Sequence, residues 1–215
     1  MAAQCQNLTE KEIQALNKRL EWQLKNLDRG IEYIALDLDY MKLFVFVDSS
    51  FANNKDFSSQ IRYLIILSNE TANETANGID EFTIKGNLIH YSSTKSKRVT
   101  RSVLASEIYG MVGGVDMAIA INITIRMITS QLGLPPIVII VCTDSYSLYE
   151  CLVKLRITKE KCLMINIMVL CQSYERREIA EVRWINGKDN PADAMTKSTP
   201  NKALERFLDN NQLTI

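Results

Sequence analysis

Four acidic residues that lie far apart in the sequence stand at positions where a metal site could be built. Asp48 and Asp144 each end a short apolar run of the kind typical of a buried strand. Glu107 lies early in a long apolar segment that predicts a buried helix, and Asp193 lies in the first turn of a short predicted helix. A buried carboxylate is costly unless hydrogen bonds or a cation compensate it. We therefore expect the four side chains to converge.

The chemistry of such a cluster follows from its ligand type. Carboxylates that lie close together raise one another's pKa unless a cation neutralises them. A site of oxygen ligands without His or Cys suits Mg²⁺ or Mn²⁺. Two such ions about 4 Å apart can activate a water and stabilise the leaving oxygen of a phosphodiester. Each acid alone is explained equally well as a helix cap or a surface residue, so this prediction depends on all four together.

The elements that must position these acids alternate between strands and helices, which predicts a mixed α/β sandwich. Gly86 can break the third strand, and the tandem Asn-Glu-Thr-Ala repeat of 69–76 with Asn77-Gly78 predicts a surface loop before it. Strands are predicted at 42–48, 61–68, 82–91, 137–142 and 181–185. Helices are predicted at 9–28, 102–128, 146–153, 159–174 and 190–197, and a terminal helix from Pro200 is followed by a polar tail.

The composition is that of an ordinary globular protein. Of the 215 residues 47% are apolar and 23% are charged, and 25 basic residues balance 25 acidic ones, so net charge does not advertise a nucleic-acid partner. The five Cys and single His disfavour disulfides and zinc. The most apolar stretch, 111–128, carries Asp116 and Arg126, which favours a core helix over a membrane span. We expect an intracellular protein that is not secreted and has no membrane partner.

The N-terminal segment predicts a separate amphipathic helix. Thr9 and Glu12 have the spacing of a capping box, apolar residues follow at helical spacing, and Gly30 is a plausible stop. The apolar stripe is expected to pack on the main domain or on a partner. We divide the chain into 1–40, this helix with a connector, and 41–215, the main domain.

The residues around the four acids resemble the ribonuclease H (RNase H) domain of copia-type LTR retrotransposon polyproteins, with the fungal versions most similar. The resemblance extends over nearly the whole chain, and 8–40 is similar to the connector from the reverse transcriptase. It is carried by 46–52 (Phe-Val-Asp-Ser-Ser-Phe-Ala), 102–109 (Ser-Val-Leu-Ala-Ser-Glu-Ile-Tyr), 143–145 (Thr-Asp-Ser) and 190–197 (Asn-Pro-Ala-Asp-Ala-Met-Thr-Lys).

The resemblance implies a five-stranded mixed sheet, its first three strands antiparallel, with helices on both faces. It also implies hydrolysis of the RNA strand of an RNA–DNA hybrid with two Mg²⁺ ions, for which Mn²⁺ can substitute. Asp48 would bridge both ions, Glu107 and Asp144 would hold one, and Asp193 would hold the other next to the attacking water. A reverse transcriptase polymerase domain on another chain is a possible partner.

The chain departs from this family at two places, one of which is 48–52, where Asp-Ser-Ser-Phe-Ala replaces the more usual Asp-Ala-Asp-Trp-Ala while the first acid is kept. Many RNases H carry a histidine in the loop before the fourth acid, but the loop 186–190 has none, and His90 belongs to the third predicted strand. Lys188 or Asn190 can take over part of that role. No Asp-Asp pair occurs, so the polymerase centre of a reverse transcriptase is absent and the chain is not expected to synthesise DNA.

Basic residues supply candidate contacts to a nucleic-acid backbone. A run before Glu107 and a second group, Arg176, Arg177, Arg183 and Lys188, fit a phosphate groove and a plain solvated surface equally well. The open alternatives to a nuclease are a binding module that no longer cuts and a domesticated or decayed interaction fragment. The candidate nucleic-acid contacts are Ser49, Lys95, Lys97, Arg98, Arg101, Ser145, Lys188 and Asn190.

Overall fold

The computed structural model describes residues 9–54, 56–74, 80–154, 161–195 and 201–215, which form two units, Met1–Glu32 and Tyr33–Ile215. The first unit contains helix α1 (Glu10–Lys25). The predicted capping box is present, because the backbone N–H of Thr9 donates to the Glu12 carboxylate at 2.8 Å. No residue of α1 is buried. Its packing on a domain or a partner stays a prediction.

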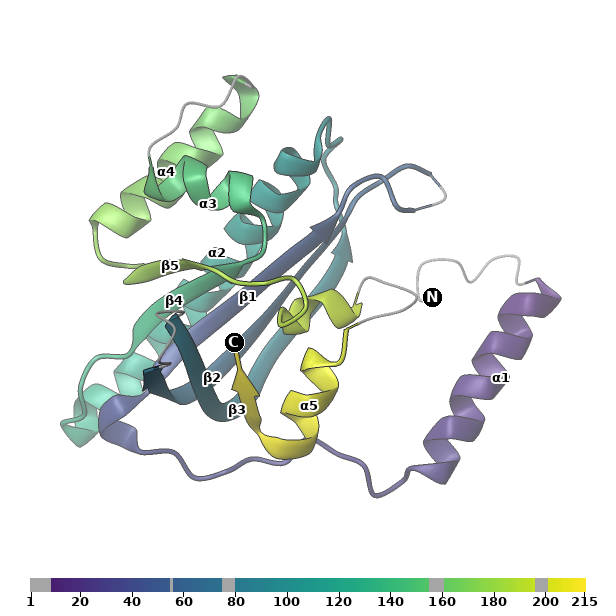
Figure 1. The fold of residues 1–215 in the computed structure, drawn as a ribbon, viewed down its shortest axis with the longest axis horizontal. Coiled ribbons are helices and arrows are strands. Elements are labelled where there is room, and N and C mark those ends of the chain that lie inside the picture. The colour runs from purple at the N-terminus through teal and green to yellow at the C-terminus, as the bar shows by residue number, and fades with distance from the viewer. Residues whose placement is uncertain (1–8, 55, 75–79, 155–160, 196–200) are drawn as a thin grey trace. The chain divides into compact units, whose positions relative to one another are not determined.

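The second unit is built on one mixed sheet with the order β5-β4-β1-β2-β3-β6 (Figure 1). The strands β1, β2 and β3 are antiparallel, and β4 and β5 run parallel to β1. Helices cover both faces. The protein therefore has an α/β fold of the RNase H type. The strands are β1 (Lys42–Ser50), β2 (Gln60–Glu74), β3 (Asp80–Lys95), β4 (Val138–Thr143), β5 (Glu181–Trp184) and β6 (Gln212–Thr214).

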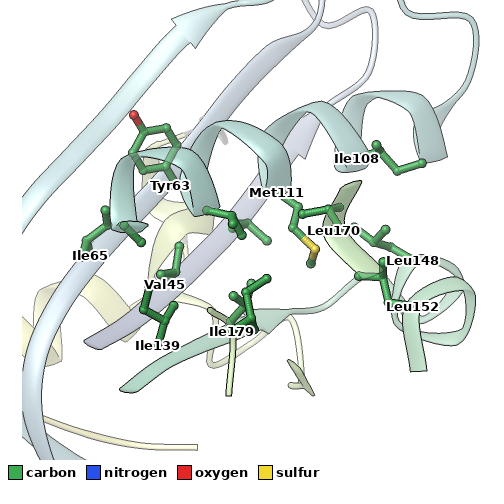
Figure 2. Close-up of a cluster of buried hydrophobic side chains, with 14 of the residues drawn as sticks. Val45, Tyr63, Ile65, Ile108, Met111, Ile139, Leu148, Leu152, Leu170 and Ile179 are labelled. Atoms are coloured by element: carbon green, nitrogen blue, oxygen red, sulfur yellow. The ribbon is translucent and has the colours of Figure 1, made fainter. Parts of the chain in front are cut away.

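The alternation of β1 divides the core into two halves. Leu43, Val45 and Val47 belong to the core half under α2 (Val103–Thr129), α3 (Tyr146–Val153) and α4 (Met164–Glu175). Figure 2 shows Val45 in this half together with Met111 and Leu170. The intervening Phe44 and Phe46 pack on the other face with Phe207 of α5 (Ala203–Asn210). All these side chains of β1 are fully buried, so the strand that leads to Asp48 is fixed from both sides.

Helix α2 lies close against β1 and β2. Ser102 caps it by accepting a hydrogen bond from Ala105 N at 3.1 Å. The helix is long and apolar enough to cross a membrane by composition, but it lies on the sheet, as the predicted core helix should. Gly114 permits the close approach, since a Cβ atom there would lie 3.1 Å from methyl groups of Val45 and Val47. This contact fixes the height of α2 above the strand.

Several predicted boundaries need correction. The repeat at 69–76 was expected in a loop, yet 69–74 pairs in register with 80–85 and lengthens the β2–β3 hairpin; 75–79 lies outside the described residues. Gly86 does not break β3, because the irregularity is a bulge opposite Ile65/Ile66. The sheet has six strands and not five. The predicted polar tail contains β6, whose Leu213 is buried in the second core half and whose backbone pairs with β3.

Two helices also begin differently from the prediction. In the helix predicted at 159–174, residues 159 and 160 lie outside the described residues, Lys161–Leu163 forms a short 3-10 turn, and α4 follows it. The helix predicted at 190–197 is a 3-10 helix over Pro191–Met195, and 196–200 lies outside the described residues. A 3-10 turn is common at helix ends and as a connector.

The connector after α1 is tied to the sheet from Tyr33 onward. Asn87 of β3 accepts a hydrogen bond from Ile34 N at 2.8 Å and donates one to Ile34 O at 2.9 Å. Asn69 of β2 makes the same pair of bonds with the backbone of Asp37, at 2.8 Å each. Two amide side chains thus hold this extended segment against the β2–β3 hairpin.

Candidate active site

One row of charged side chains crosses three neighbouring strands at the end of β1. Val47 pairs with Thr143 of β4, so the next residues along, Asp48 and Asp144, lie beside each other at the carboxyl ends of two parallel strands. On the other side of β1, Asp48 pairs directly with Arg62 of β2. Residues opposite each other in a pair share a face of the sheet, so the row consists of Asp144, Asp48 and Arg62, in the order β4, β1, β2.

Glu107 reaches the same place from α2. It lies one helical turn before Gly110, where the helix passes the end of β1: a Cβ at Gly110 would lie 3.6 Å from Asp48 O and 3.7 Å from Ser49 Cβ. Glu107 is 6% exposed and Asp48 is 7% exposed. The close approach of the helix therefore delivers a carboxyl group to the end of the strand inside the protein.

Asp193 is held in the 3-10 helix Pro191–Met195 and is 2% exposed. Asn190 anchors the start of this helix, because its fully buried side chain donates to Val47 O at 3.0 Å and accepts from Ala192 N at 3.1 Å. Asn201 holds the far side: its amide donates to Asn190 O at 2.9 Å, and its backbone N–H lies 3.5 Å from the Asp193 carboxylate. The loop is thereby fastened to the last buried residues of β1.

The electrostatics of the buried groups indicate that they lie close enough to interact. Burial, followed by the charges of Asp48 and Asp144, raises the pKa of Glu107 well above its ordinary value, while the Ser49 hydroxyl acts in the opposite direction. The Glu107 Oε2 atom is buried and accepts no hydrogen bond from any described residue. A carboxyl group in this situation is stabilised by either a proton or a nearby cation.

Arg62 is a buried cation among the described residues around the acids. It is 3% exposed, and its Nη1 lies 3.6 Å from Asp48 Oδ2 while its Nη2 donates to Ser50 Oγ at 3.3 Å. Burial lowers its pKa to about 10, and the charges of Asp48, Asp193 and Glu107 oppose that shift. Arg62 thus interacts with three of the four acids, and Glu107 with Asp144 links the fourth.

The fit of this cluster to a metal ion has two sides. In favour, the donor set is all carboxylate and a buried Glu107 oxygen has no hydrogen bond, which suits Mg²⁺ or Mn²⁺. Against it, no group of three or more His, Cys, Asp or Glu side chains within the described ranges is arranged to hold a metal as it stands. The residue types are suitable ligands for these ions. Arg62, which lies among them, supplies part of the positive charge that a bound ion would bring.

The predicted nucleic-acid contacts near the acids differ in accessibility. Ser49 is 9% exposed and Asn190 is fully buried with both ends of its amide engaged, so neither presents a free polar surface. Ser145 is half-buried at the start of α3, and Lys188 is exposed in the turn after β5. That turn is close to the cluster, because a Cβ at Gly187 would lie 3.1 Å from Asp144 Oδ2.

The basic run lies at the same end of the sheet. Gln60 at the start of β2 pairs with Ser50 and with Lys95, so the end of β3 is level with the end of β1. Lys97, Arg98 and Arg101 follow in the exposed segment that leads into α2. Arg98 lies over the Tyr109 ring at 5.3 Å, and Lys95 forms an ion pair with Asp56.

The second basic group is divided. Arg183 is half-buried, paired with Glu70 and Glu181 and placed over the Phe82 ring, which makes it a structural residue of the sheet. Arg176 and Arg177 are exposed in the turn after α4. His90 lies in β3 with its ring 5.8 Å from the Tyr63 ring, away from the acids.

Sequence reasoning missed two residues of the site. Arg62 is a charge within the apolar strand run 61–67, and the hairpin register that pairs it with Asp48 depends on a strand that begins one residue earlier than predicted. Asn201 carries no motif, and its role appears only when its amide meets the backbone of Gly187 at 2.8 Å. The signal available in the sequence was a charged residue, Arg62, inside an otherwise apolar strand run.

Comparisons with known proteins give likeness in structure alone. No protein-family model matches the chain, and no curated protein does. The similar solved structures include LC11-RNase H1 in complex with an RNA/DNA hybrid, with 16% identity, a TM-score of 0.47, and coverage of 76% of this chain and 99% of that one.

Two further structures show the same pattern. The RNase H domain of a Mycobacterium tuberculosis protein has 17% identity and a TM-score of 0.44, over 77% of this chain and 95% of that one. The prototype foamy virus protease–reverse transcriptase has 11% identity and a TM-score of 0.39, over 85% of this chain and 22% of that one. At such TM-scores the likeness carries no argument about activity.

Proposed function

We propose that the protein is a metal-dependent endonuclease that hydrolyses the RNA strand of RNA–DNA hybrids. One observation carries this proposal: Asp48 of β1, Glu107 of α2, Asp144 just after β4 and Asp193 of a 3-10 helix interact at one end of the sheet. A protein that only needed to fold would gain nothing from burying like charges together, because the mutual repulsion and desolvation are unfavourable. Such arrangements are typical of catalytic sites.

The four carboxylates would hold Mg²⁺ or Mn²⁺. The bound ions would supply a nucleophilic water and stabilise the charge that develops on the phosphodiester oxygens. The chain's own residues hold the geometry: β1 and β4 fix Asp48 and Asp144 side by side, and α2 delivers Glu107. Asn190 and Asn201 orient the segment that carries Asp193.

The basic run lies at the same end of the sheet as the acids, and this position supports a nucleic-acid substrate. Lys97, Arg98 and Arg101 are exposed beside the carboxyl end of β1, so a phosphate backbone held by them would pass the acids. Contacts to 2′-hydroxyls are the general means by which a protein distinguishes RNA from DNA. The resemblance to copia-type elements extends the proposal to a retrotransposon origin and to a reverse transcriptase domain on another chain as partner. The five Cys and single His extend it to an intracellular location.

A second candidate is a nucleic-acid-binding module that does not cut. The observation that favours it is Arg62, which already supplies a positive charge to Asp48, Glu107 and Asp193. A cluster compensated in this way holds together without a metal ion, and the basic run can still bind a backbone. The two candidates differ in one outcome, which is whether the RNA strand is cleaved.

The deciding experiment is cleavage of an end-labelled RNA–DNA hybrid with Mg²⁺, with Mn²⁺ and with EDTA. The parent chain should cleave only with a metal, and Asp48→Asn should reduce the rate by at least ~100-fold, as for loss of a group that acts in the transition state. Asp116→Asn, an exposed aspartate of α2 outside the cluster, is the matched control and should cleave like the parent. Cleavage that Asp48→Asn leaves intact would refute the site, and binding without cleavage would favour the second candidate.

A further inference from the structure

The guanidinium of Arg62 is a buried charged group on a face of β2 whose neighbouring side chains are apolar. Its neighbours along the same face of β2, Leu64 and Ile66, lie in the apolar core. Arg62 is as buried as they are, at 3% exposed, and its Nε and Nη1 atoms have no hydrogen-bond partner among the described residues. A charged group placed there is unfavourable unless other charges compensate it.

That compensation comes from the acids of the cluster. Arg62 stands directly opposite Asp48 in the sheet, with Nη1 3.6 Å from Asp48 Oδ2. It also interacts with Asp193 and Glu107. The contact to Asp48 is an ion pair longer than a hydrogen bond, so the guanidinium is held by the summed charge of the acids and not by one directed bond.

We propose that Arg62 is a resident cation of the carboxylate cluster that competes with divalent ions for it, and so sets how much Mg²⁺ or Mn²⁺ the site needs. The inference rests on the proposed function, since it concerns the same acids. A divalent ion at Asp48 would lie next to a buried positive charge and would have to share that carboxylate with it. The repulsion and the shared ligand both weaken metal binding.

The arrangement of the acids agrees with this assignment. As they stand, no three acids in the described part of the chain are placed to hold a metal, although their donor types suit one. An ion bound at Asp48 would lie beside the guanidinium, whose Nη1 is 3.6 Å from Asp48 Oδ2. Removal of the guanidinium takes away one positive charge beside this carboxylate, so a divalent ion would meet a more negative cluster.

The test compares Mn²⁺ affinity, measured by the electron paramagnetic resonance signal of free Mn²⁺, in the parent and in Arg62→Met. Met is of similar length and apolar. Arg62→Met should bind Mn²⁺ at least ~10-fold more tightly, which corresponds to about 1.4 kcal/mol. It should also melt at a lower temperature than the parent in EDTA and show the larger rise on Mn²⁺ addition. Neither readout depends on cleavage.

Two further variants separate charge from shape. Arg62→Lys keeps a positive charge and should retain the Mn²⁺ affinity of the parent. Arg183→Met is the matched control: it removes another arginine of the sheet, half-buried and paired with Glu70 and Glu181, that lies outside the cluster. It should lower stability without changing Mn²⁺ affinity.

The outcomes are distinguishable. Equal Mn²⁺ affinity in the parent and Arg62→Met overturns the competition but leaves the proposed function standing, whereas no Mn²⁺ binding in either overturns both. Equal tightening by Arg62→Lys and Arg62→Met, or by Arg183→Met, also overturns it, because charge at this position would not be the cause. Should Arg62→Met be unfolded in EDTA, refolding on Mn²⁺ addition supports the inference, and failure to refold at saturating Mn²⁺ overturns it.

Discussion

Neutralising Glu107 isolates the cost of burying the acidic cluster. In the metal-free protein its pKa is raised well above the ordinary 4.5 by burial and by the charges of Asp48 and Asp144. The folded state therefore binds a proton that the unfolded state has released over the pH range above 4.5. By linkage, the contribution of Glu107 to the free energy of unfolding falls as pH rises through 4.5 and levels off above the folded pKa.

Glu107→Gln removes this titration and keeps the shape of the side chain. Above pH 4.5 in EDTA the folded parent must either retain a proton that the unfolded state releases or bury an ionised carboxyl, and leaving the buried Oε2 without a hydrogen bond costs about 1–3 kcal/mol. The variant should be more stable than the parent by that amount, which raises the melting temperature by about 2–10 °C for a domain of this size. The difference between variant and parent should shrink toward zero below pH 4.5.

The assay is urea unfolding in EDTA at a series of pH values, followed by tryptophan fluorescence. Glu178→Gln, an exposed position after α4, is the control and should follow the parent at every pH. A variant that is less stable than the parent at pH 8, or a stability difference that decreases as pH rises, would refute the electrostatic reasoning. Saturating Mn²⁺ should reverse the order, because an amide is a poorer ligand than a carboxylate for a hard cation.

Two further predictions test the framework and the substrate face. Gly114→Ala should destabilise the protein by about 1–3 kcal/mol relative to Gly113→Ala, because a Cβ meets Val45 and Val47 at 3.1 Å in the first case but only a Tyr63 ring atom at 3.7 Å in the second, while both gain the same helix propensity; equal melting temperatures would count against the close contact. Lys97→Ala should weaken hybrid binding and reduce the slope of log K against log salt by about 0.9, whereas Lys85→Ala, at an earlier lysine within β3, should not; an unchanged slope for Lys97→Ala would exclude a phosphate contact there.

The order of the elements could be predicted from the sequence because it depends on local patterns. The continuous apolar runs before Asp48 and Asp144 are typical of strands buried on both faces, and the adjacency of β1 and β4 follows from that class of fold. The capping box at Thr9 and the helix start at Ser102 use side chains within one turn. These helix starts can be predicted because the hydrogen-bonding partners are only a few residues apart in the sequence.

The parts that were missed depend on pairing between distant segments. The Asn-Glu-Thr-Ala repeat is polar enough for a loop, and only pairing with β3 makes its first residues a strand. Strand β6 is three residues long and gains its place from Leu213 and the edge of β3. The side chain of Asn190, which was predicted to contact nucleic acid, forms hydrogen bonds with the backbone of Val47 and Ala192. Tertiary contacts override local propensity in each case.

The charge balance at the site was the least predictable feature. The sequence supplies four acids with suitable spacing, and their mutual interaction follows once β1, β4 and α2 are placed. Whether Arg62 lies beside them depends on the register of β2 against β1, and a shift of one residue would put Arg62 on the other face of the sheet. A single pairing thus decides whether this arginine adds its positive charge to the cluster.

The most direct test of the central claim is an anomalous difference map from a crystal of the protein soaked in Mn²⁺. The account predicts a peak among the carboxylates of Asp48, Glu107, Asp144 and Asp193, at metal–oxygen distances of about 2.0–2.3 Å, stronger in Arg62→Met than in the parent. A map that shows bound Mn²⁺ elsewhere, with none at these carboxylates in either protein, would contradict it.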